Sequence, residues 1–165
     1  SKTQVLNRIS NVDVVALGLS ESEGLKTFYV DQANHGGHSM DRSQVYNDAA
    51  QSSIYATTID RFVEAAKLPR VDVIKVDVQG LELEVLKGAK ATLAAYVPVL
   101  IVEFSFSSSF NEAYLHFFRE LPVRYRFSEP GSETLHDLDE LKTLVPRKKA
   151  QGFFYGDFVF VPDRK

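Results

Sequence analysis

The chain has 165 residues but no cysteine, no tryptophan and only one methionine. Without cysteine the protein forms no disulfide bonds, although this absence leaves the redox compartment open. The lone methionine and the missing tryptophan carry no functional information.

Long apolar runs and clusters of basic residues are also missing. No apolar segment approaches the roughly 20 residues that a membrane-spanning helix needs, and no signal-peptide pattern opens the chain. A formal net charge of −3 without a basic block argues against a nucleic-acid footprint. We therefore expect a cytoplasmic protein with neither a nucleic-acid nor a membrane partner.

A hydrophobic content of 44% over 165 residues predicts one sizeable core, so we expect residues 1–165 to form a single domain. Strand-like and helix-like segments alternate without internal repeats, which predicts an α/β fold. The expected strands are 12–19, 25–30, 54–57, 71–76, 98–104, 123–127 and 153–161, and the expected helices are 2–9, 59–67, 81–95, 112–120 and 138–144. The polar composition of residues 31–53 predicts a long loop. We also expect a solvated loop at Arg147, Lys148 and Lys149, before the last strand.

The most informative segment is VDVIKVDVQGLELEVLKGA, from Val71 to Ala89. It reads as a buried strand that carries Lys75 and Asp77, breaks at Gly80 and passes into a helix. In open α/β sheets ligands bind outside the carboxyl ends of the strands, so charge at such an end indicates a site. Were this strand central and covered on both faces, the Lys75 ammonium would need a carboxylate partner.

A second apolar strand, PVLIVEF, also ends in charge, at Glu103. If the two strands are parallel neighbours, Glu103, Lys75 and Asp77 cluster at their carboxyl ends. Such a cluster is compatible with a structural ion pair that holds the register and equally with a direct functional role.

The loop NHGGHSM, residues 34–40, offers two histidines beside a glycine pair. An imidazole titrates near neutral pH, so His35 or His38 could act as a general base, or both could be solvated loop residues. Together with Asp77 and Glu103 they form no recognised metal-binding spacing, so we expect no metal.

In their order and spacing these segments resemble the FkbM family of S-adenosylmethionine-dependent methyltransferases. The pattern K-x-D-x-[EQ]-G-x-E-x-x-V-L-K-G-A occurs from Lys75 to Ala89, and P-x-x-x-V-E from Pro98 to Glu103. Upstream, NVDVVALGLSESEGLKTFYV, GGHSM and ATTIDRFVEAAKL look like the family's third strand with its hairpin, its Gly/Ser loop and the entry to the next helix. The resemblance extends from about residue 12 to residue 104.

This resemblance implies a Rossmann-like class I methyltransferase sheet with helices on both faces. It also implies transfer of a methyl group from S-adenosylmethionine to a hydroxyl of a sugar or small metabolite. The candidate residues are Asp77, Lys75, Glu103 and His38 for catalysis, Asp77, Gln79 and Gly80 for the cofactor, and His35, His38 and Glu82 for the substrate.

One part of the class I pattern is missing from this chain. Neither D-x-G-x-x-x-G nor G-x-G-x-x-G occurs, so the resemblance implies a sheet without its first two strands. The chain is then either part of a longer enzyme or a non-catalytic remnant that serves as a binding or oligomerisation module. We expect the strand at 71–76, with its edge exposed, to join the strand at 12–19 directly or to pair with another copy of the chain.

Overall fold

The computed structural model describes residues 10–31, 38–45, 50–106 and 112–163. Their strands are β1 (Gly18–Leu19), β2 (Gly24–Val30), β3 (Ala50–Thr57), β4 (Val73–Val76), β5 (Val99–Ser105), β6 (Tyr125–Ser128), β7 (His136–Asp137) and β8 (Tyr155–Pro162). Their helices are η1 (Arg42–Gln44), α2 (Ile59–Ala65), α3 (Glu82–Lys87), α4 (Lys90–Tyr96), α5 (Ala113–Glu120), η2 (Leu138–Glu140) and α6 (Leu141–Ala150). They confirm a mixed α/β fold, while the helix expected at 2–9 lies outside the described residues.

The two strands that were expected to carry the site are parallel neighbours, as predicted. β4 and β5 pair from Val73 with Val99 to Val76 with Val102. The helix expected between them is two helices, α3 and α4. At the break, a Cβ on Gly88 would stand 2.3 Å from the carbonyl oxygen of Ser20, so only glycine lets these backbones approach.

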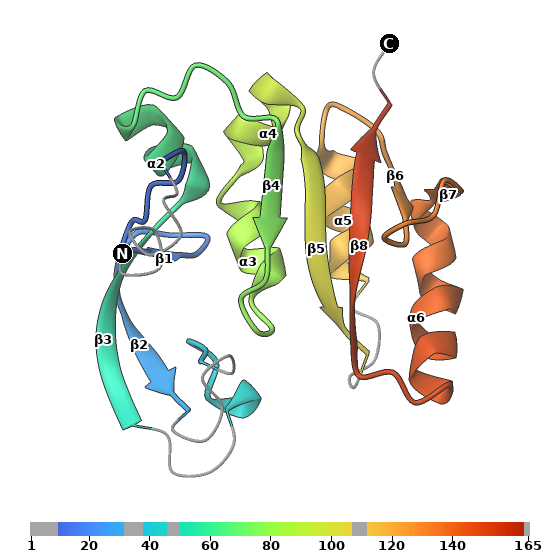
Figure 1. Ribbon diagram of the computed structural model, residues 1–165, viewed down its shortest axis with the longest axis horizontal. Helices are drawn as coiled ribbons and strands as arrows, with labels where there is room; N and C mark the ends of the chain where they lie inside the picture. Colours follow the sequence, from blue (N-terminus) through green and yellow to red (C-terminus); the bar gives the residue numbers. More distant parts are fainter. Residues whose placement is uncertain (1–9, 32–37, 46–49, 107–111, 164–165) are drawn as a thin grey trace.

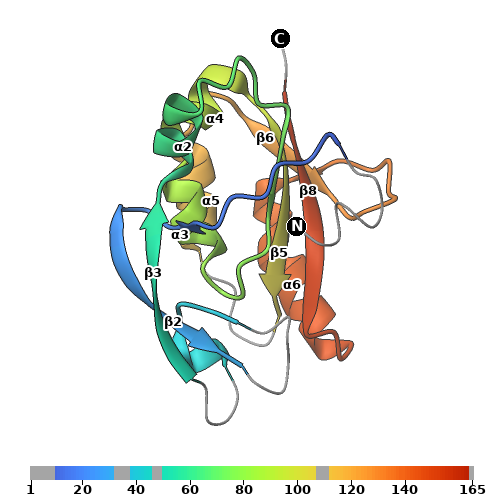
Figure 2. The ribbon, with the colours of Figure 1, turned by 60° about the vertical axis from the view of Figure 1, so that its left-hand side comes forward.

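Strand β8 lies between β5 and β6 and runs antiparallel to both, giving the order β4-β5-β8-β6-β7. Alternate side chains of β5 and β8 are buried, among them Leu100, Val102, Phe158 and Phe160. Helices α3, α4 and α5 lie on the same side of this sheet (Figures 1 and 2). On the other face Val73 is 55% exposed, so none of the described helices covers β4 at this position.

The structure has a second sheet that the sequence did not predict, with the order β1-β3-β2. β1 pairs in parallel with β3 and forms no ladder with β4, so the predicted direct joining of these strands is wrong. The expected strand at 12–19 is reduced to two residues, because the preceding apolar side chains face solvent and are 40–65% exposed: Val12, Val14, Val15 and Leu17. Pairing of β4 with another copy of the chain stays a prediction.

Two further boundaries differ from expectation for identifiable reasons. β3 begins at Ala50, inside the expected loop, because its antiparallel ladder with β2 continues to Val30. Arg147, Lys148 and Lys149 form the last turn of α6 and not a loop, since this helix is held by its buried residues Leu141, Leu144 and Val145. Helix α2 is capped by Thr58, whose side chain accepts a hydrogen bond from the Arg61 N–H.

Candidate functional site

The turn that follows β4 has an unusual backbone. Gln79 and Gly80 both adopt positive φ, at 54° and 96°. The carboxylate of Glu82 accepts hydrogen bonds from the N–H of Val78 at 3.1 Å and from the N–H of Gly80 at 3.0 Å. Glu82 is only 4% exposed, so its carboxylate holds the turn from inside.

The strained conformation of Gln79 aims its side chain at two carboxylates. A left-handed conformation costs a residue with a Cβ about 1–2 kcal/mol, so it needs support from its surroundings. Part of that support comes from Ser39, whose hydroxyl donates to the Gln79 carbonyl at 3.0 Å. The Gln79 Nε2 then donates to Asp77 at 3.3 Å and to Glu103 at 3.2 Å.

Five side chains from β4, its turn, β5 and β8 form what we call the Asp77 cluster: Lys75, Asp77, Gln79, Glu103 and Asp157. The Lys75 Nζ lies 2.7 Å from Asp77 Oδ2 and 3.8 Å from Asp157 Oδ1. The structure thus brings Lys75, Asp77 and Glu103 together as predicted. The condition under which Lys75 would be covered on both faces is not met, because β4 is the edge strand among the described strands of its sheet and the Lys75 side chain is 49% exposed.

The two carboxyl groups nearest Gln79 have opposite electrostatic environments. A hydrogen bond from Lys75 holds the pKa of Asp77 below its ordinary value. Burial raises the pKa of Glu103 to about 7, and the neighbouring carboxylates of Asp77, Glu82 and Asp157 add to the effect. Near neutral pH the site therefore pairs an ionised acid with one that exchanges its proton readily.

Asp157 is the member of the cluster that sequence reasoning missed. It lies on β8 directly opposite Glu103, and its Oδ1 is buried with no hydrogen-bond partner. Oδ1 lies within ion-pair distance of Lys75, but at 3.8 Å this contact is too long for a hydrogen bond. The only local signal was an acid in the otherwise aromatic and apolar run FFYGDFVFV.

A pocket of about 290 Å³ opens beside Asp77 and also includes His38. The other residues that line it are Leu17, Gly18, Leu19, Phe28, Ser39, Met40, Ile54 and Val78. The His38 Nδ1 accepts a hydrogen bond from the Asp31 N–H at 3.0 Å, which leaves the proton of the neutral ring on Nε2. Of the two candidate histidines, His38 thus shares a pocket with Asp77, whereas His35 lies outside the described residues.

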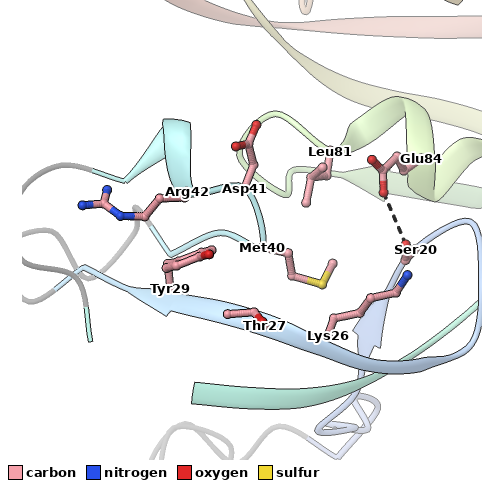
Figure 3. Close-up of a pocket in the computed structure, with 9 residues that line it drawn as sticks. All are labelled: Ser20, Lys26, Thr27, Tyr29, Met40, Asp41, Arg42, Leu81 and Glu84. Carbon is pink, nitrogen blue, oxygen red and sulfur yellow. Dashed lines mark hydrogen bonds between the residues drawn. The ribbon is translucent and has the colours of Figure 1, made fainter. Parts of the chain in front are cut away.

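A second pocket, of about 360 Å³, lies between β2 and the start of α3 (Figure 3). Its polar lining was not predicted: Ser20, Lys26, Thr27, Tyr29, Asp41, Arg42 and Glu84. Met40 lines both pockets, so the loop that carries His38 separates the two. In the part of the chain that the structure describes, no three His, Asp or Glu side chains are grouped so that they could hold a metal ion.

The sequence profile of the Methyltransferase FkbM domain matches residues 4–138. The chain belongs to the FkbM methyltransferase family. The FkbM match includes Lys75, Asp77, Gln79 and Glu103, whereas β8 with Asp157 follows the matched region. No curated protein and no solved structure matches the chain.

Proposed function

We propose that this FkbM domain transfers a methyl group from S-adenosylmethionine to a hydroxyl of a sugar or another small molecule. The observation that carries the proposal is the Asp77 cluster at the carboxyl ends of two parallel strands, where Glu103 has a pKa of about 7. Membership of a methyltransferase family supports the reaction class.

The charges of the cluster fit the positively charged end of this cofactor. Three carboxyl groups surround one ammonium, and the buried Asp157 Oδ1 has no hydrogen-bond partner. A sulfonium and an α-ammonium are cations that such oxygens stabilise. Asp77 and Gln79, with the Gly80 backbone, would hold this end. When bound, the cofactor supplies an electrophilic methyl group.

The protein's own residues then have to position the acceptor and remove one proton. Glu103 takes the proton of the acceptor hydroxyl, because a carboxylate with a pKa of about 7 is a sufficiently strong base at neutral pH. Lys75 keeps Asp77 ionised, and the Gln79 amide fixes both carboxylates in place. The acceptor lies between the Asp77 cluster and the pocket shared by His38 and Asp77, so that its reacting hydroxyl meets Glu103 while the His38 Nε2–H donates to its other oxygen atoms.

Calorimetric titration with S-adenosylmethionine tests the proposal. We expect micromolar binding by the native chain and a loss of at least about tenfold in Asp77→Asn, since one removed charge contact in a partly buried site has that effect. Asp139→Asn is the matched control, because this exposed aspartate pairs with Arg119 away from the cluster. Absence of binding by the native chain would contradict the catalytic proposal.

The variants Asp77→Asn and Asp139→Asn can also be compared in a methyl-transfer assay. With radiolabelled cofactor and a panel of sugars and small hydroxyl compounds, Asp77→Asn should abolish transfer while its circular dichroism spectrum stays native. Lys75→Met should alter stability only mildly, because Lys75 is half exposed. Full activity of Asp77→Asn would remove Asp77 from the mechanism.

The edge of β4 favours a second candidate, a binding or oligomerisation module. Among the described strands β4 pairs only with β5, and Val73 on it is 55% exposed. Unpaired strand edges join other strands readily, so two copies could extend the sheet. Sedimentation velocity would then show a dimer that Val73→Lys converts to a monomer, and a concentration-independent monomer would exclude this candidate.

Among the helices formed by described residues, none has the length and apolar character to span a bilayer.

A further inference from the structure

Three consecutive aromatic side chains face solvent where α6 leads into β8. Phe153, Phe154 and Tyr155 are 51%, 68% and 43% exposed. We call these three residues the aromatic tip. Adjacent exposed apolar side chains of this size usually mark an interaction surface, because water solvates them poorly.

The aromatic tip is held outward by the residues around it. The Phe106 N–H donates to the Phe154 carbonyl at 2.7 Å, and the Phe153 N–H donates to the Lys148 carbonyl at 3.1 Å. The fully buried Phe106 ring lies so close to Gly156 that an added Cβ would stand 2.8 Å from it. The Phe106 ring thus fills the space at Gly156, next to the tip, while the three aromatic side chains of the tip are exposed.

A basic turn precedes the aromatic tip. Arg147, Lys148 and Lys149 form the last turn of α6, and no acidic residue occurs between positions 141 and 156. The Lys148 ammonium lies 5.2 Å from the Phe153 ring centroid and also pairs with Glu129. Because Lys148 is paired, the positive charge beside the tip comes from the exposed Arg147 and Lys149, in a protein whose formal net charge is −3.

Contrary to the expectation from composition that the protein has no membrane partner, we propose that the aromatic tip and the basic turn together dock on the anionic lipid surface of a membrane. Phenylalanine rings insert at the boundary between headgroups and acyl chains, while lysine and arginine meet the negative headgroups. The connection between α6 and β8 lies at one end of the five-stranded sheet (Figure 1). Three basic residues are too few to follow a nucleic-acid backbone.

Docking in this way would also orient the Asp77 cluster, although docking does not rest on the proposed function. Tyr155 and Asp157 are two residues apart on β8 and therefore project from the same face of the sheet. A docked molecule would therefore hold the sheet face that carries Asp157 toward the side of the protein that meets the lipid.

Co-sedimentation with lipid vesicles tests the proposal. The native chain should bind phosphatidylcholine vesicles that contain phosphatidylserine and bind pure phosphatidylcholine far more weakly, and added salt should weaken the binding. The double variant Phe153→Ser with Phe154→Ser should bind at least about tenfold more weakly. The double variant Arg147→Gln with Lys149→Gln should lose about fivefold per removed charge.

Two control variants match these changes elsewhere on the surface. Leu25→Ser removes an apolar side chain that is 77% exposed on β2. Lys67→Gln with Arg70→Gln removes two charges from the connection between α2 and β4, at the opposite end of the molecule from the tip (Figure 1). Both controls should bind vesicles like the native chain.

Three results would overturn the proposal. They are native-like vesicle binding by the double phenylalanine variant, equal binding to neutral and anionic vesicles, and tighter binding to a single-stranded oligonucleotide than to anionic vesicles. Because every substituted residue is exposed, the variants should keep the native urea midpoint, and that measurement separates lost binding from lost folding.

Discussion

Replacing Glu103 with glutamine should make the protein more stable at alkaline pH. The Glu103 carboxyl has a pKa of about 7 in the folded chain against an ordinary value of 4.5. Between these pH values the folded protein holds a proton that the unfolded chain has released, so the free energy of unfolding falls as the pH rises. Glu103→Gln removes this ionisation and with it the loss of stability.

The size of the effect follows from the same two values. A rise from 4.5 to about 7 corresponds to roughly 3 kcal/mol if the group is fully shielded from water. Glu103 is only partly buried, and solvent screening reduces the figure to about 1–2 kcal/mol. We therefore expect Glu103→Gln to exceed the native protein by about 1–2 kcal/mol at pH 8 and to match it near pH 4.

Urea unfolding followed by circular dichroism at pH values from 4 to 8 measures this difference. Glu133→Gln is the control, since this exposed glutamate should change stability by less than about 0.5 kcal/mol at every pH. In the methyl-transfer assay Glu103→Gln should be inactive despite its greater stability, as expected for a catalytic base whose charged form is destabilised by burial. A variant that is less stable at pH 8, or a difference independent of pH, would refute the reasoning and make Glu103 a structural partner of Lys75.

Three further predictions concern the same part of the fold. Asp77→Asn should lower the pKa of Glu103 toward 4.5, because the Asp77 carboxylate is the largest charge that raises it, and carbon-13 NMR of the labelled carboxyl measures the change. Gly88→Ala should cost about 3 kcal/mol or more in urea unfolding, since its Cβ would meet the Ser20 carbonyl oxygen at 2.3 Å, and a cost below about 1 kcal/mol would contradict that contact. Glu82→Ala should cost about 2–3 kcal/mol, because two N–H groups of the turn lose their acceptor, whereas Glu82→Gln should retain part of that stability.

Local pattern was enough to predict the elements that contain the site. The β-branched run around Lys75, the glycine break and the helical spacing after it predicted a strand, a turn and a helix, and β4, the turn and α3 confirm them. Parallel pairing of β4 with β5 also followed from the sequence, because a crossover of this length returns the chain alongside the first strand. The family resemblance stated from these motifs is confirmed as well.

Tertiary structure alone decided which side chains complete the site and which face of the sheet stays open. Asp157 follows Glu103 by more than fifty positions and comes opposite it only because β8 inserts between β5 and β6. The shared pocket of His38 and Asp77 likewise depends on the contact between Ser39 and the Gln79 carbonyl. Periodicity records which residues share one face of an element, but strand order and loop contacts come from packing between distant segments.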